Sequence, residues 1–77
     1  MTQQSWVEKV EHFARVRAQI KQILYRTMRP MDMAEIYDRF KESYRFLPDI
    51  ERRMRELKKS GEVLENDGSI STYELAK

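Results

Sequence analysis

The sequence contains no cysteine and only one histidine. Without cysteine there are no disulfide bonds and no thiolate metal sites, so an apolar core must hold the fold together. No apolar run approaches the roughly 18 residues that span a bilayer, and the polar N-terminus lacks the apolar segment of a signal peptide. We therefore expect a cytoplasmic protein that makes no use of a membrane.

The chain also has little that could carry catalysis. Its one histidine, His12, stands beside Phe13 without a nucleophile pattern nearby. The two glycines, Gly61 and Gly68, fit a helix end and a turn, which leaves none for a phosphate-binding loop. The carboxylates are scattered and lack metal-ligand spacing. The sequence therefore predicts no enzyme activity, no cofactor, no metal and no small-molecule ligand.

Charge is distributed unevenly along the 77 residues, although the net charge is only +2. Residues 1–29 carry six basic and two acidic side chains, and residues 41–60 carry seven basic and four acidic. Residues 61–77 carry one basic and four acidic side chains. A chain of this length forms a single domain, so this domain has two basic segments and an acidic C-terminal segment.

Apolar periodicity predicts a long first helix over about residues 5–28. Large apolar residues recur at three-, four- and seven-residue steps, as on one helix face: Trp6, Val10, Phe13, Ile20 and Leu24. Ser5 and Glu8 have the spacing of a capping box, in which each side chain bonds a backbone N–H at the helix start. Pro30 ends the helix, because proline disfavours helical geometry in Arg29 before it.

Two shorter helices are predicted next. Asp32 and Glu35 form a second capping-box pattern, and this helix ends near residues 41–43. Pro48 suits the first turn of a third helix, and Gly61 suits the position after its end, where φ is positive. The third helix has apolar residues at helical spacing: Ile50, Met54 and Leu57.

A β-hairpin is predicted after the third helix. Strand-forming residues begin at Val63, and a second strand covers residues 70–75. Between them, Asn66-Asp67-Gly68 contains the residues that favour a tight turn. Six further large side chains are expected to pack where the helices meet: Met28, Met31, Met33, Tyr37, Tyr44 and Phe46. The predicted fold class is therefore mainly α with a small β-hairpin, an α+β fold.

Three short motifs stand at positions that match a known family. Residues 29–36 read RPMDMAEI, residues 50–57 read IERRMREL before a glycine and a valine, and residues 73–75 read YEL. In order and spacing these motifs resemble the winged helix-turn-helix family. The resemblance covers residues 19–77, and it implies a three-helix fold followed by a β-wing.

The resemblance also implies a domain organisation and a function. Residues 19–60 would form the three-helix core and residues 61–77 the β-wing, with residues 1–18 as a helical extension outside the minimal fold. The turn between the second and third helices is longer than the tight bacterial type. Family members of this size are small bacterial or phage transcription regulators, which implies sequence-specific binding of double-stranded DNA with the third helix in the major groove.

The third helix would supply the base contacts. If its apolar residues face the core, four residues near its start face outward: Asp49, Arg52, Arg53 and Glu56. Arg52 and Arg53 are the strongest candidates, because arginine pairs bidentately with guanine. Phosphate contacts are expected from nearby cations: Arg55, Lys58, Lys59, Lys41, Arg45, Arg26 and Arg29. The wing tip, with Asn66, would lie near a minor groove.

Two alternatives remain for this basic helix. Glu51 stands four residues before Arg55, which is also the pattern of an ordinary solvated helix face. Acidic side chains of the wing would repel phosphate: Glu62, Glu65, Asp67 and Glu74. The alternative function is therefore a winged-helix docking module that binds protein and has no direct contact with DNA.

The first helix begins with an apolar stripe, Trp6, Val10 and Phe13. In so small a domain the stripe either folds back to enlarge a thin core or forms an interface, since an isolated apolar stripe is costly to expose. The interface would be that of a homodimer, and two-fold pairing would suit a palindromic DNA site.

Overall fold

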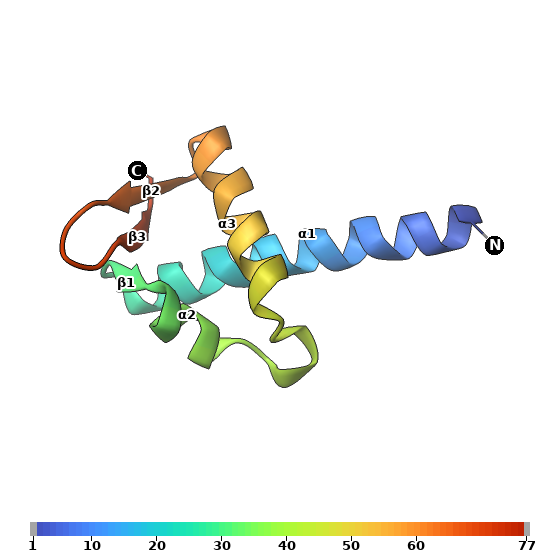
Figure 1. Cartoon of the computed structure of the whole chain (residues 1–77), viewed down its shortest axis with the longest axis horizontal. Helices are drawn as coiled ribbons and strands as arrows, with labels where there is room; N and C mark the ends of the chain where they lie inside the picture. Colours follow the sequence, from blue (N-terminus) through green and yellow to red (C-terminus); the bar gives the residue numbers. More distant parts are fainter. Residues whose placement is uncertain (1, 77) are drawn as a thin grey trace.

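The computed structural model describes residues 2–76, with side chains described for residues 6–76. These residues form seven elements: α1 (Thr2–Thr27), β1 (Met31–Asp32), α2 (Met33–Arg39), the short 3₁₀ helix η1 (Glu42–Tyr44), α3 (Leu47–Ser60), β2 (Val63–Asn66) and β3 (Thr72–Leu75). The expected α+β class is confirmed. In Figure 1, α3 crosses α1 near its middle, and the β-hairpin lies at the C-terminal end of α1.

Two of the predicted helix ends are confirmed. The Glu35 N–H donates to Asp32 Oδ1 over 2.8 Å, and the Asp32 N–H donates to Glu35 Oε1 over 3.2 Å, which completes the capping box of α2. Gly61 follows α3 in the left-handed conformation, with φ of 84°. Its N–H donates to the Lys58 carbonyl over 3.1 Å, so two local signals set where α2 begins and α3 ends.

The ends of α1 differ from the prediction. Its backbone is already helical at Thr2, so Ser5 lies inside the helix and is not its N-cap. The helix ends before Met28, whose φ of 55° is left-handed although it is not glycine. The Met28 side chain is 86% exposed, so the expectation that Met28 fills the core is wrong. Met31, by contrast, is fully buried.

The sheet has one strand that the sequence did not predict. The strand order is β1-β3-β2, and both pairs are antiparallel. Met31 of β1 pairs with Tyr73 of β3, and Val63 of β2 pairs with Leu75. The link between α1 and α2 is thereby joined to the hairpin, and this pairing anchors the hairpin to the helical body.

The core lies between the C-terminal half of α1, the buried faces of α2 and α3, and the sheet. Its buried apolar residues are Val16, Ile20, Ile23, Leu24, Met31, Ile36, Phe40, Ile50, Met54, Leu57 and Val63. The three predicted core positions of α3 are therefore confirmed. Tyr37 and Tyr44 pack against this core, but Phe46 is 58% exposed, so its expected burial is wrong.

The N-terminal part of α1 extends beyond the body of the domain (Figure 1). Trp6 is 68% exposed and Val10 is 45% exposed. These two side chains therefore do not fold back to enlarge the core, and that interpretation of the apolar stripe is wrong. Phe13 is half-buried, at the point where α1 meets α3. None of the helices in the described part of the chain is both long enough and apolar enough to span a bilayer.

Candidate nucleic-acid interface

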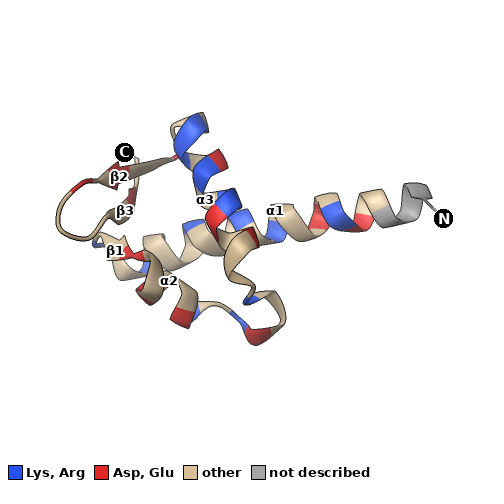
Figure 2. Ribbon diagram, in the orientation of Figure 1, with Lys and Arg blue, Asp and Glu red and all other residues tan. Residues whose placement is uncertain are grey.

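The exposed face of α3 carries three cations in a row. Arg52, Arg55 and Lys59 are spaced by three and four residues, so they share one side of the helix. All three are exposed, and they lie opposite the buried residues of α3. None of the ion pairs found among the described residues involves them. We call Arg52, Arg55 and Lys59 the cationic stripe; Figure 2 shows basic residues repeating along α3.

Arg53 does not belong to this stripe, and the prediction that it faces outward is wrong. The residue is only 6% exposed. Its Cζ lies 3.8 Å from the centroid of the Phe13 ring, and its Nη2 lies 3.0 Å from Glu56 Oε2. The helical period gives the reason, because Arg53 stands three residues after Ile50 and four before Leu57, on the core side of α3.

Two other residues expected to face DNA are engaged by α1. His12 Nε2 lies 3.3 Å from Asp49 Oδ2, and Asp49 is half-buried. Arg17 Nη1 donates to Glu56 Oε1 over 2.9 Å, while Glu56 stays exposed. Of the four residues predicted to point outward near the start of α3, only Arg52 is both exposed and free of ion pairs among the described residues.

The expected phosphate-binding cations around α3 divide into engaged and free groups. Arg45 Nη2 donates to the carbonyls of Asp38 and Phe40, over 3.2 and 3.1 Å, and so bonds carbonyls at the end of α2. Arg29 pairs with Glu35, whose pKa is lowered mainly by the hydrogen bond from this guanidinium. Arg26 and Lys41 are also exposed, and neither is in an ion pair of the described residues.

Part of the negative charge of residues 61–77 is paired with cations of the helices. Glu65 pairs with Lys58 of α3, and this bond lowers the pKa of Glu65. Glu62 accepts from Lys21 over 2.8 Å and from the Ser60 hydroxyl over 2.7 Å, and its pKa is lowered for the same reason. Two of the four acidic wing residues are thus paired with cations of the helical body.

The expected wing-tip contact, Asn66, is engaged within the hairpin. Its Nδ2 donates to Glu74 Oε2 over 2.8 Å, which joins β2 to β3. The Asn66 side chain remains exposed, but one of its donors is occupied. Asn66 therefore has a structural role, since its hydrogen bond to Glu74 joins the two strands of the hairpin.

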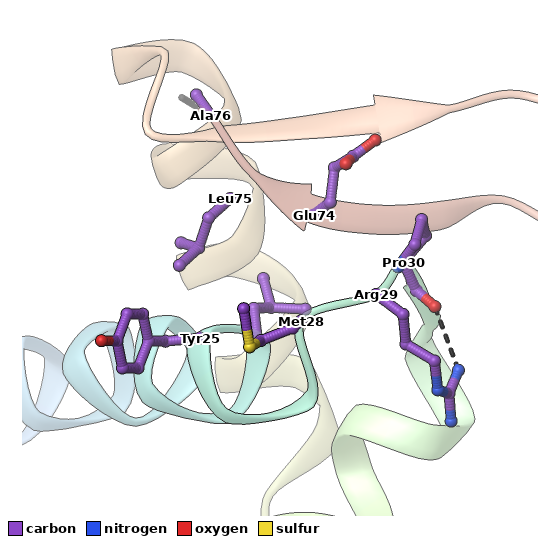
Figure 3. Close-up of a pocket in the computed structure, with 8 residues that line it drawn as sticks. Tyr25, Met28, Arg29, Pro30, Glu74, Leu75 and Ala76 are labelled. Carbon is purple, nitrogen blue, oxygen red and sulfur yellow. Dashed lines mark hydrogen bonds between the residues drawn. The ribbon is translucent and has the colours of Figure 1, made fainter.

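A hollow lies away from α3, between the end of α1 and the end of β3. It measures about 340 Å³ and is lined mainly by apolar groups, including Tyr25, Met28, Pro30 and Leu75. Figure 3 shows Tyr25 of α1, and Met28 just after the end of that helix, below Leu75 of β3. Within the described part of the chain, no group of three or more His, Cys, Asp and Glu residues is placed to hold a metal ion.

Searches against protein-family models, curated proteins and solved structures found no match. The resemblance of residues 29–36 and 50–57 to the winged helix-turn-helix family therefore rests on the chain's own sequence motifs alone.

Proposed function

We propose that this chain is a winged helix-turn-helix protein that binds double-stranded DNA, with α3 in the major groove. One observation carries the proposal: the cationic stripe stands on the exposed face of α3, without ion pairs among the described residues. The fold supports it, since α3 is followed by an antiparallel hairpin that β1 joins to the body. In this arrangement Arg52, nearest the start of α3, reaches base edges.

The flanking cations would position the helix. Arg55 and Lys59 lie along the same face as Arg52 and would contact phosphates that border the groove. Lys41, in the segment before α3, adds a cation that is also exposed. Phosphate contacts of this kind release counterions, so the three phosphate contacts of Arg55, Lys59 and Lys41 give a slope of log K against log salt of about −2.7.

A titration of duplex DNA across salt concentrations tests the proposal. The variant combines Arg52→Ala, Arg55→Ala and Lys59→Ala, and we expect it to lose most of the salt-dependent affinity. The matched control is Lys9→Ala with Arg15→Ala, which removes exposed cations of α1 and should change binding little. Losses in proportion to the charges removed, three against two, would mean that binding follows net charge, and an unchanged triple variant would reject the cationic stripe as the DNA site.

The exposed end of α1 favours a further partner, a second copy of this chain. Trp6, Val7 and Val10 present apolar surface on a helix that extends beyond the body. We propose a homodimer formed through this stripe, with Phe13 contributing less than expected because it is already covered by Arg53. Light scattering of the wild type and of Trp6→Ala with Val10→Ala tests this: the wild type should be a dimer and the variant a monomer.

The same surface favours the second candidate function, a docking module for another protein. The two functions differ in their response to salt. DNA binding should weaken steeply as salt rises, whereas docking on the apolar stripe should change little. Weak, salt-insensitive binding to every duplex would favour docking.

A further inference from the structure

Arg53 is held in a position where its hydrogen bonds are incomplete. Its Nη2 pairs with Glu56, but its Nε and Nη1 are buried without an acceptor among the described residues. A buried donor without an acceptor has lost its bonds to water and gained none in return. The Phe13 ring, 3.8 Å from Cζ, is therefore the main group that stabilises the guanidinium at this place.

Phe13 is not an isolated contact. His12 and Arg17 of α1 bond Asp49 and Glu56 of α3, so the two helices are joined on both sides of the Phe13–Arg53 pair. The centroid of the His12 ring also lies 5.8 Å from that of Phe13. These contacts fix α1 against α3 and keep the Phe13 ring over the guanidinium.

Arg53 also borders the free face of α3. A shallow hollow of about 220 Å³ is lined by the cationic stripe together with Glu56 and Arg53. A change of rotamer would carry the guanidinium from beneath Phe13 toward this hollow. There, a phosphate oxygen would give Nε and Nη1 the acceptors that they lack in the buried position.

We propose that the Phe13–Arg53 contact is autoinhibitory, and that it withholds a fourth cation from a nucleic-acid phosphate bound at the cationic stripe. Loss of the aromatic contact lets Arg53 turn outward and add one phosphate contact. This inference rests on the proposed binding of DNA by the stripe, and it assigns Phe13 a regulatory role in that binding.

The test uses the full chain and three variants. Phe13→Leu keeps an apolar cover over Arg53 but removes the aromatic face. Arg53→Met removes the charge at nearly constant length, and the double variant combines the two changes. The matched control is Tyr25→Leu, an aromatic replacement on an exposed part of α1 that does not line the hollow on α3. Circular dichroism first verifies that each variant is folded.

Fluorescence anisotropy with a labelled duplex then gives affinity and salt slope. At about 0.1 M salt, one additional phosphate contact raises affinity about eightfold and steepens the slope by about 0.9. We expect this gain for Phe13→Leu and for neither Arg53→Met nor the control. The double variant should return to the wild-type affinity, because the gain requires Arg53.

Two results would overturn the autoinhibitory role. One is equal affinity and slope for the wild type and Phe13→Leu; the other is weaker binding by Arg53→Met alone, because Arg53 would then already contact DNA. Exchange of the Arg53 Nε–H with water, followed by NMR, gives a readout without DNA and should be faster in Phe13→Leu. If exchange is faster but no protein binds DNA, the proposed function fails, and with it the role of Arg53 as a DNA ligand.

Discussion

Replacement of Arg53 by methionine should leave the fold at least as stable as the wild type, although it removes the ion pair and the cation–π contact of a buried guanidinium. Nε and Nη1 are buried donors without an acceptor in the part of the chain that the structure describes, and each costs about 1–3 kcal/mol. The cation–π contact with Phe13 stabilises the folded state by about 2 kcal/mol in a desolvated site. The ion pair with Glu56 stabilises it by at most about 1 kcal/mol, because the Glu56 carboxylate is half exposed.

These opposing contributions nearly cancel, and methionine adds a favourable contact of its own. Its thioether against the Phe13 ring contributes about 0.3–1.5 kcal/mol, and its length avoids a cavity. We therefore expect Arg53→Met to raise the free energy of unfolding by about 1 kcal/mol, in line with other buried ion pairs replaced by apolar residues. Arg53→Ala, which leaves a cavity beneath Phe13, should instead lower it by about 2 kcal/mol.

Chemical denaturation at equilibrium measures both changes, and thermal unfolding gives a second value. In a chain of this size, 1 kcal/mol corresponds to a shift in Tm of about 4–8 °C. A fall of more than about 1.5 kcal/mol in the free energy of unfolding of Arg53→Met would refute the reasoning. The ion pair and the cation–π contact of Arg53 would then stabilise the fold by more than the burial of Nε and Nη1 destabilises it. Arg52→Met, at the exposed neighbour, is the control and should be nearly neutral.

Three further predictions concern the helix ends and the surface ion pairs. Met28→Gly should stabilise the fold by about 0.5–1 kcal/mol in denaturation experiments, because φ of 55° is strained for methionine and its exposed side chain packs little. Gly61→Ala should destabilise it by about 1 kcal/mol, since φ of 84° is unfavourable for alanine although space is open; a neutral result would contradict the left-handed cap. Glu62 and Glu65 have lowered pKa values, so their contribution is present above the unfolded pKa of about 4.3 and is lost as the pH falls through the folded values. Double replacement by glutamine should therefore flatten the loss of stability as the pH falls below about 5, and an unchanged pH profile would mean that the pairs contribute nothing.

The sequence predicted the local features of the fold well. The Asp32–Glu35 capping box and the Gly61 cap each depend on residues a few positions apart, so one sequence window contains the whole signal. The strand β1 has only two residues, and it exists because Tyr73 and Thr72 pair with it across the chain. No local pattern of Met31 and Asp32 could have indicated it.

The sequence predicts the candidate site less well, because the charge of a side chain is a poor guide to its exposure. Arg53 was expected outside with Arg52, yet its partner Phe13 lies 40 positions earlier and on another helix. One signal was present in the sequence: Ile50, Arg53, Met54 and Leu57 follow the 0, 3, 4, 7 spacing of a single buried face. An arginine inside such a stripe is a candidate for burial, with its guanidinium stacked on an aromatic ring.

The pairing of acidic residues changes the electrostatic argument about the wing. Taken as composition, residues 61–77 repel phosphate, which favoured a docking function. In the structure, Glu65 is paired with Lys58 and Glu62 with Lys21, so these carboxylates are neutralised by cations that face the wing and not the stripe. Among the described residues, the cations of α3 that have no ion-pair partner are those of its exposed face. A charge that is not already paired attracts the phosphates of a nucleic acid most strongly. The distribution of unpaired charge, more than the net charge of +2, is therefore the reason to test α3 as the DNA-binding element.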